Sequence, residues 1–403
     1  MNKRTFIFAA SIVAILFIGA GAYFLFFSSS QTGSGVSIGG FPLASSTGPG
    51  GSEGGFALLG QEEGASGAAA VARLSQIATG PVVPSMLAFD SAASSTPSAS
   101  QAVVRYIDRP SGNVYSYDVT SGTNTRISNK TIPGVVEASW LPDGSRAYLR
   151  YLSNENGAPT IATYALSANG TDGFYLPQDI TALAANSTGV LALVSGANGS
   201  IATRATADYR NPKTAFQTPL GEIQVAFAGK DSYLVYTKPS ATQNGYAFLV
   251  HNGAFEQVAG PYKGLSTRIS PDGTKALVSY RSTQGAMQLA LLDLSTYATT
   301  ALPVATLADK CVWAADSSSA YCGIPDSPPA AMYPDDWYQG AAAFSDRVWR
   351  IDAKNRYVQL VLDPASAGKG AFDVTALALD PAEQVLSFVN KQDGSLWAYR
   401  LTP

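Results

Sequence analysis

A strand-and-turn unit recurs along the chain and constrains the fold more than any other feature. Four segments place a turn containing Asp or Asn before an apolar strand: LPDGSRAYLRY (141–151), AANSTGVLALV (184–194), SPDGTKALVSY (270–280) and AADSSSAYCGI (314–324). In a Pro-Asp-Gly turn, Pro presets φ, Asp bonds its own backbone and Gly takes a positive φ. We therefore interpret the polar residue that the four turns share as a turn former rather than a catalytic group: Asp143, Asn186, Asp272 and Asp316.

The spacing of these units predicts an all-β ring. From about Val82 the chain alternates short strands rich in Val, Ile, Leu, Tyr and Thr with turn residues, and no amphipathic helix stands out. Most units start about 42 to 45 residues apart, the length of a four-stranded propeller blade. The starts lie near Val82, Val135, Ile180, Glu222, Gly264, Leu307 and Val374. We predict a seven-bladed β-propeller, with six or eight blades as alternatives.

The two ends of this domain are expected to share one blade. The last unit stops at Leu401-Thr402-Pro403, after its third strand. An open sheet edge invites aggregation, so a closed ring needs a fourth strand there. We expect VARLSQIA (71–78) to supply it. The low-complexity segment SAASSTPSASQ (91–101) is interpreted as a loop.

The repeats resemble a known group of propellers. LPDGSRAYLRY and SPDGTKALVSY look like the repeat of TolB-like, WD-repeat-like β-propellers, also found in prolyl-oligopeptidase-type peptidases. The resemblance covers about residue 135 to the end, although the Trp-Asp dipeptide of WD repeats is absent. No α/β-hydrolase domain follows, so peptidase activity is not carried over. The resemblance implies an extracytoplasmic propeller that binds partners through its rim, face or central channel.

The N-terminal residues predict a membrane anchor. Lys3 and Arg4 precede an uncharged apolar run, residues 5–27, whose roughly 34 Å of helix would span a bilayer. The positive-inside rule leaves residues 1–4 as a cytoplasmic stub and sends the rest outside, as a single-pass protein of the cell membrane. A cleaved signal peptide, with Ala20-Gly21-Ala22 as its site, is the alternative. Residues 28–70 are rich in Gly and Ser and predict a flexible tether to a propeller at 71–403.

Charge and metal-ligand counts exclude several classes of protein. The formal net charge is −3, and no basic run follows the first four residues, which argues against nucleic acid as a partner. A single histidine, His251, and two cysteines exclude a multi-histidine metal site or a zinc ribbon. We expect no metal, no cofactor and no catalytic role for His251, which we place in a strand next to a turn.

Cys311 and Cys322 flank one predicted hairpin turn, CVWAADSSSAYC. If Asp316-Ser317 form its centre, the two cysteines face each other across an antiparallel pair, within disulfide reach. An oxidising compartment would allow the bond, so we predict a disulfide; two buried thiols are the alternative.

A long insertion, about 324–347, marks the candidate binding site. It combines several prolines with the residues that we propose as contacts: Tyr333, Asp335, Asp336, Trp337 and Tyr338. Aromatic side chains on a stiff loop are frequent binding hot spots. The alternative is that Trp337 and Tyr338 fold back as a lid over the blade. The contact hypothesis predicts that replacing both with Ala weakens partner capture without unfolding the domain.

Two functions follow from this sequence. The first is a membrane-anchored binding or scaffold module for a protein or glycan partner, without enzymatic activity. The alternative is a hydrolase or lyase that acts on carbohydrate through paired carboxylates in the central channel. The second function requires two carboxylates about 5 to 10 Å apart in a cleft, one with a raised pKa.

Overall fold

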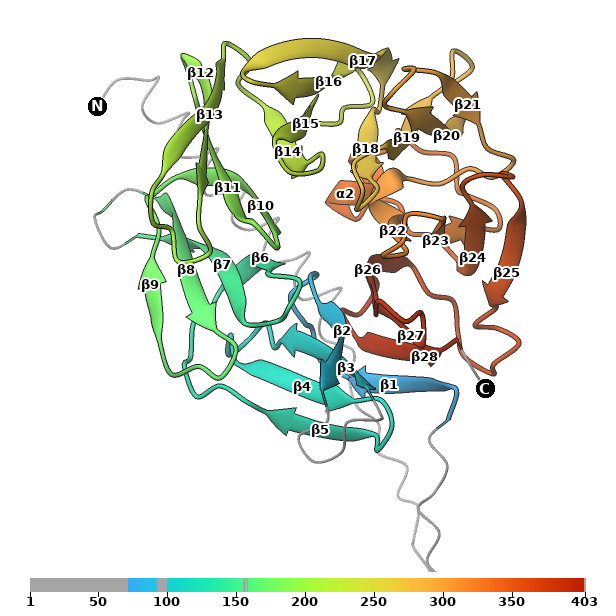
Figure 1. The fold of residues 1–403 in the computed structure, drawn as a ribbon. Coiled ribbons are helices and arrows are strands. Elements are labelled where there is room, and N and C mark those ends of the chain that lie inside the picture. The colour runs from blue at the N-terminus through green and yellow to red at the C-terminus, as the bar shows by residue number, and fades with distance from the viewer. Residues whose placement is uncertain (1–71, 93–99, 155–156, 158, 402–403) are drawn as a thin grey trace, which may run out of the picture. The chain divides into compact units, whose positions relative to one another are not determined.

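Seven four-stranded antiparallel sheets surround a common centre, so the chain forms a seven-bladed β-propeller, as predicted (Figure 1). The computed structural model describes residues 72–92, 100–154, 157 and 159–401, which belong to one compact unit, Ala68–Pro403. The predicted stub, membrane span and tether lie outside the described residues. Within those residues, no helix is both long and apolar enough to cross a bilayer.

The first three blades follow one another along the chain, and each runs from an innermost to an outermost strand (Figure 1). Blade 1 contains β2 (Leu87–Ala92), β3 (Ser100–Ile107), β4 (Val114–Asp118) and β5 (Thr123–Arg126). Blade 2 contains β6 (Val135–Trp140), β7 (Arg146–Ser153), β8 (Thr160–Ser167) and β9 (Gly173–Tyr175). Blade 3 contains β10 (Ile180–Asn186), β11 (Gly189–Gly196), β12 (Gly199–Ala205) and β13 (Lys213–Thr218).

The remaining four blades repeat this order. Blade 4 contains β14 (Ile223–Phe227), β15 (Ser232–Thr237), β16 (Asn244–His251) and β17 (Ala254–Lys263). Blade 5 contains β18 (Ser266–Ile269), β19 (Lys275–Arg281), β20 (Met287–Asp293) and β21 (Thr299–Ala301). Blade 6 contains β22 (Cys311–Trp313), β23 (Ser319–Pro325), β24 (Asp346–Asp352) and β25 (Val358–Leu362). Blade 7 contains β26 (Val374–Leu379), β27 (Val385–Asn390), β28 (Leu396–Arg400) and β1 (Leu74–Ala78).

The ring closes through a strand from the beginning of the domain. β1 pairs antiparallel with β28, with Leu74 opposite Tyr399 and Gln76 opposite Trp397. The side chains of Leu74 and Ile77 are buried. This confirms the prediction that residues 71–78 supply the outer strand of the last blade, and it covers the edge of β28.

Two boundaries at the start of the domain were predicted wrongly. The first blade begins at Leu87 rather than near Val82, which instead forms an isolated bridge with Asp108. The segment 91–101 is not wholly a loop, because β2 extends to Ala92 and β3 begins at Ser100. Pairing between neighbouring strands extends them into a segment whose composition alone resembles a loop. Residues 93–99 lie outside the described part of the chain.

The recurring Asp and Asn residues form turns, as predicted. Each side-chain oxygen accepts the backbone N–H two residues on, at 3.0 Å in Asp143, 2.9 Å in Asn186, 3.0 Å in Asp272 and 2.9 Å in Asp316. These bonds fix the hairpin between the first two strands of four blades. His251 ends β16, where its Nδ1 lies 3.0 Å from the Ser232 hydroxyl, so it is a strand residue next to a turn.

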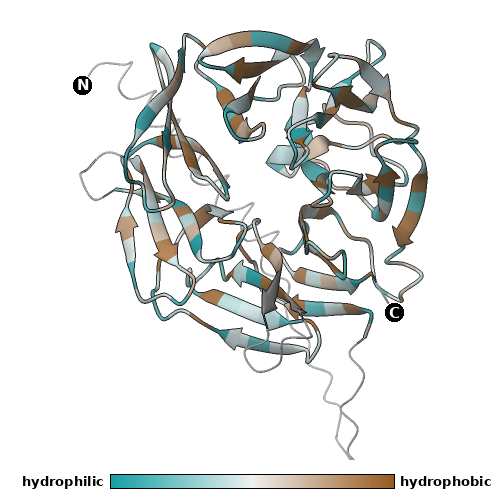
Figure 2. Ribbon diagram, viewed as in Figure 1, coloured by the Kyte–Doolittle hydropathy of each residue, from teal (hydrophilic) through white to brown (hydrophobic). Residues whose placement is uncertain are grey.

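The apolar core lies between neighbouring sheets. Val104 of blade 1 shares a cluster with Val385 and Val389 of blade 7, and Leu191 of blade 3 packs with Val235 of blade 4. Figure 2 shows hydrophobic segments alternating with polar ones along the blades. Each sheet therefore buries both faces against its neighbours, which holds the ring together.

Within the described residues, the all-β prediction missed two short helical elements. A 3-10 turn, η1, spans Ala308–Lys310, and a five-residue α-helix, α2, spans Asp335–Gln339 within the insertion of blade 6. Both are too short to show a helical period in the sequence. Gly340 ends α2 in the left-handed conformation, with φ of 79°.

Candidate functional site

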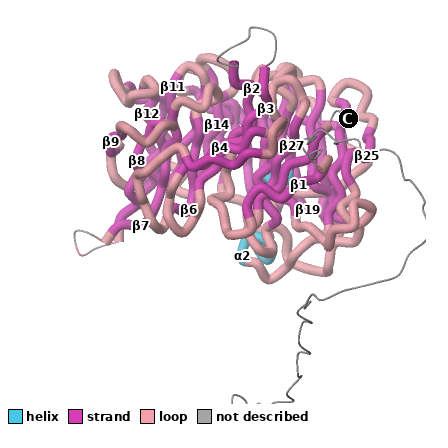
Figure 3. The backbone as a smooth tube through the Cα atoms, turned by 90° about the horizontal axis from the view of Figure 1, so that it is seen from below, coloured by secondary structure: helices cyan, strands magenta, loops and turns pink. Residues whose placement is uncertain are grey.

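The insertion of blade 6 covers part of one face of the ring. It comprises residues 326–345, between β23 and β24, and its helix α2 lies near the centre in Figure 1 and at one face in Figure 3. The Asp335 carboxylate accepts the N–H of Ala241, in the β15–β16 loop of blade 4, at 3.0 Å. Arg281 of blade 5 donates to the Ala241 carbonyl at 3.0 Å. These bonds connect the insertion to blade 4 and that loop to blade 5.

Aromatic side chains form the interior of the insertion. Tyr333, Trp337 and Phe344 are 5%, 3% and 2% exposed and pack in one cluster with Leu307. The Tyr333 hydroxyl donates to the Pro329 carbonyl at 2.6 Å. Trp337 therefore packs as a lid residue. Tyr338, by contrast, is 42% exposed.

A buried lysine and two buried carboxylates lie beneath this aromatic layer; we call Lys310, Asp346 and Asp373 the Lys310 cluster. The Lys310 Nζ lies 2.7 Å from Asp346 Oδ2 and 2.6 Å from Asp373 Oδ1, and its side chain is fully buried. The Trp337 indole N–H donates to both oxygens of Asp373 at 3.0 Å. Lys310 also lies 5.0 Å from the Trp337 ring and 4.7 Å from the Phe344 ring. The cluster thus joins the insertion to blades 6 and 7.

Burial dominates the electrostatics of this cluster. It raises the pKa of Asp346 to about 6, although Lys310 favours the ionised form. One Asp346 oxygen accepts the Val374 N–H at 2.6 Å, while Oδ1 is buried and has no hydrogen-bond partner. Burial also lowers the pKa of Lys391, whose Nζ donates to the Trp337 carbonyl at 2.6 Å. Each charge therefore depends on its neighbours for stabilisation.

Asp346 and Asp373 share one feature with the carboxylate pair that the enzymatic alternative requires, because the pKa of Asp346 is raised. They differ from such a pair in two ways: solvent does not reach them, and their negative charges are paired with a lysine. Both side chains are at most 1% exposed, and both bind Lys310 directly. A substrate could not reach them without displacing the insertion. In this arrangement, the pair holds the insertion in place.

A second polar contact fixes Tyr338, one of the two exposed residues of α2. The Tyr338 hydroxyl donates to Asp309 Oδ2, which also accepts the Ser266 hydroxyl at 2.8 Å. Burial of the hydroxyl and the nearby Asp309 carboxylate raise the pKa of Tyr338 well above its usual range. The phenol therefore stays neutral and keeps donating to Asp309, which fixes the direction of its ring.

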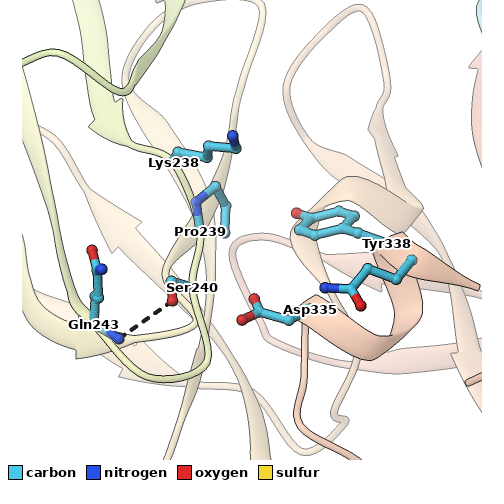
Figure 4. A pocket seen from close by; sticks show the side chains of 7 residues that line it. Lys238, Pro239, Ser240, Gln243, Asp335 and Tyr338 are labelled. Atoms are coloured by element: carbon cyan, nitrogen blue, oxygen red, sulfur yellow. Dashed lines mark hydrogen bonds between the residues drawn. The ribbon is translucent and has the colours of Figure 1, made fainter. Parts of the chain in front are cut away.

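A groove of about 400 Å³ separates α2 from the β15–β16 loop. Its lining residues are Lys238, Pro239, Ser240, Gln243, Asp335, Tyr338 and Gln339. Figure 4 shows Tyr338 and Pro239 on opposite sides of the groove, with the Asp335 carboxylate directed toward Ser240. The groove thus combines an aromatic ring with amide, hydroxyl, carboxylate and ammonium groups. Its volume is within the range of small-ligand sites.

A second groove, of about 520 Å³, has no aromatic side chain in its lining. It is lined by residues of blades 1 and 2, among them Asp143, Asn169 and Asp172. Oxygens of these three side chains already accept hydrogen bonds within their own turns. We therefore take the groove beside α2 as the candidate site.

The structure gives the five predicted contact residues three different placements. Asp335 and Tyr338 line the groove, whereas Tyr333 and Trp337 are buried. Asp336 Oδ2 accepts the Met332 N–H at 2.7 Å and braces the start of α2. Replacing Trp337 would therefore disturb the interior of the insertion, whereas Tyr338 can be replaced at the surface.

The sequence reasoning missed the residues that hold and complete the site. Lys310 was overlooked although it directly precedes an apolar strand, and Asp346 and Asp373 each begin or directly precede one. A charged residue in such a position is a signal for a buried ion pair. Lys238 and Gln243 come from another blade, and nothing in their local sequence connects them to the insertion.

The predicted disulfide between Cys311 and Cys322 is present, and the two residues are directly opposite each other in β22 and β23. Because Cys311 follows Lys310, the bond also fixes the backbone next to the Lys310 cluster. Within the described part of the chain, His, Cys, Asp and Glu side chains form no group of three or more that could hold a metal ion.

The fold and this capped face define the protein as a seven-bladed β-propeller. No protein-family model and no curated protein matches the chain. It is similar in structure to the Niastella koreensis GH74 enzyme, with a TM-score of 0.54 and 12% identity over 82% of this chain and 54% of that one. An oligogalacturonate lyase in complex with manganese gives 0.51 and 12% over 81% and 98%.

TolB from Acinetobacter baumannii is a further similar structure, with a TM-score of 0.42 and 12% identity over 64% of this chain and 62% of that one. The expected resemblance to TolB-like propellers is confirmed at the level of the fold by the seven four-stranded sheets. Identities this low show the fold alone.

Proposed function

We propose that this protein is a membrane-anchored, extracytoplasmic binding or scaffold module, and that its protein or glycan partner docks on the face that carries the insertion. The observation that carries the proposal is the position of Tyr338, 42% exposed on an insertion whose other aromatic residues are buried. Its hydroxyl is bound to Asp309, and its neighbour Trp337 is bound to Asp373. An exposed aromatic side chain held in one orientation loses little entropy on binding.

The anchor is part of the proposal and rests on the uncharged apolar run at residues 5–27 and the two basic residues before it. The predicted tether at 28–70 would let the propeller stand away from the membrane. The disulfide supports an extracytoplasmic position, because such bonds persist in oxidising compartments. Protease added to cells whose outer envelope has been opened should remove the propeller, whereas protection of the propeller under these conditions would contradict this topology.

The names of two similar structures support glycans as one class of partner. One is an oligogalacturonate lyase and the other a GH74 enzyme. At 12% identity the likeness extends to the fold and not to the chemistry. We favour binding over catalysis because Asp346 and Asp373 are enclosed and paired with Lys310.

Site-specific photo-crosslinking in native membranes tests the docking face. A photoreactive residue replaces Gln339, which lines the groove, and the matched control replaces Tyr357, which is 66% exposed and precedes the outer strand of blade 6. We expect an adduct from position 339 that is lost on Tyr338→Ala, and none from position 357. Equal labelling at both positions, or no adduct from position 339, would overturn the proposed face.

A further inference from the structure

The groove beside α2 has a chemistry that selects among ligand classes. The side chains of Gln243 and Gln339 are exposed there, and each amide can both donate and accept. The Asp335 carboxylate adds a further acceptor, whereas the Ser240 hydroxyl oxygen already accepts the N–H groups of Thr242 and Gln243 at 3.3 Å. A ligand that meets this set must itself carry several groups that donate and accept hydrogen bonds.

The charged side chains that line the groove are one lysine, Lys238, and one carboxylate, Asp335. Lys238 Nζ also lies 2.9 Å from Glu222 Oε2 in an exposed ion pair. Asp335 uses Oδ1 to accept the Ala241 N–H. The groove lining includes no arginine, which a site for phosphate or another strong anion would usually present. A single carboxylate is also too few to hold a divalent cation; calcium, for example, takes six or more oxygen ligands. These features favour a neutral ligand.

The ring of Tyr338 provides an apolar platform in this polar setting. Its hydroxyl donates to Asp309, so the partly exposed ring is the part of this side chain that remains to contact a ligand. The opposite side of the groove is formed by Pro239 (Figure 4). An aromatic face and a proline ring accept the flat C–H face of a sugar ring, while amide and carboxylate groups bind its hydroxyls.

From this juxtaposition we infer that the groove binds a short neutral oligosaccharide, with Tyr338 as the stacking platform and Gln243, Gln339 and Asp335 as hydroxyl-binding groups. The inference rests on the proposed function and narrows its partner to a glycan. A proline-rich peptide fits less well, because such ligands dock on grooves lined by several aromatic side chains, and Tyr338 is the one aromatic residue among the groove-lining residues.

The test uses the full-length protein in a detergent without a sugar headgroup, because a maltoside could occupy the groove. The probes are cellotetraose, maltotetraose and chitotetraose, with tetragalacturonate as the charged comparison. Affinity is measured by titration calorimetry and contact by saturation-transfer NMR. We expect at least one neutral tetrasaccharide to bind, and the charged one to bind at least about tenfold more weakly.

Three variants make the test specific. Tyr338→Ala should weaken binding about tenfold or more, because the platform is lost. Tyr338→Phe keeps the ring but loses the bond to Asp309 that orients it, so it should bind more weakly than the wild type and more tightly than Tyr338→Ala. Tyr357→Ala removes an exposed aromatic residue that precedes β25 and does not line the groove, so this variant should bind as the wild type does. Melting temperatures confirm that each variant is folded.

Three results would overturn the inference: no binding of any neutral tetrasaccharide, equal affinity in Tyr338→Ala, or preference for the charged tetrasaccharide. These outcomes differ from failure of the proposed function, which is reported by photo-crosslinking at position 339. A protein adduct there, without saccharide binding, would keep the docking face and refute the glycan.

Discussion

Replacing Lys310 with Met should strongly destabilise the propeller. Methionine has nearly the same length but carries no charge, so the substitution removes the partner of two carboxylates while keeping most of the volume. Asp346 and Asp373 are 0% and 1% exposed and lie 2.7 and 2.6 Å from the lysine nitrogen. Removing one partner of a buried ion pair costs about 3 to 5 kcal/mol, because the remaining charge is buried without compensation. We expect a loss of this size in the free energy of unfolding at pH 7.

Urea unfolding followed by tryptophan fluorescence measures this loss, and hydrogen exchange shows whether α2 is released first. Lys354→Met is the matched control, because Lys354 is an exposed lysine in the same blade. Such a surface substitution should change stability by less than about 0.5 kcal/mol. The triple variant K310M/D346N/D373N removes both unpaired charges and should recover part of the loss.

The reasoning would be refuted if Lys310→Met unfolded within about 0.5 kcal/mol of the wild type. It would also be refuted if the triple variant were less stable than Lys310→Met. In that case, the carboxylates would contribute through hydrogen bonds to Trp337 and Val374, and their charge would not be the cause.

Three further predictions concern the pH dependence, the disulfide and the closure of the ring. Because the pKa of Asp346 is about 6 in the folded state against an ordinary 3.8, the folded state binds a proton more readily. This group's contribution to stability should therefore grow by up to about 3 kcal/mol as the pH falls from about 6 to 4, and Asp346→Asn should lose that slope in urea titrations. Reducing Cys311–Cys322, which are 11 residues apart, should lower the unfolding free energy by about 2 to 3 kcal/mol, whereas an unchanged midpoint with full reduction would contradict the loop-entropy argument. Ile77→Asp should destabilise the ring by about 3 kcal/mol or more by placing a charge in the cluster between blades 1 and 7, while Gln76→Asp on the exposed side of β1 should not; equal melting temperatures would show that β1 contributes little to closure.

Most of the architecture could be read from the sequence because it is determined locally. The turn that contains Asp272 and the strand that follows it form within a few residues, and their recurrence sets the blade count. The same register places Cys311 opposite Cys322. The closing strand at 74–78 follows from the lack of a fourth strand in the last unit. The start of blade 1 was misplaced, because strand ends depend on partners as well as composition.

The candidate site was only partly predictable. The insertion stood out by its length and its aromatic residues, and Tyr338 and Asp335 do line the groove. The sequence could not separate them from Trp337, because neighbouring positions in a short helix differ by about 100° in direction and nothing local shows which direction faces the interior. Whether an aromatic residue is buried depends on what packs against it, and for Trp337 that is the aromatic cluster of the insertion together with Lys310.

By itself, the sequence determined the repeated blade, the number of blades, the disulfide and the segment that closes the ring. Only the tertiary structure decided the rest: Lys310 lies 36 and 63 positions from its two carboxylates, and Asp335 lies 94 positions from the blade 4 amide that it binds. The reason is physical. Turns and strand pairs depend on backbone hydrogen bonds between near neighbours, whereas a buried charge or a groove exists only after the ring has closed and excluded water from one set of side chains.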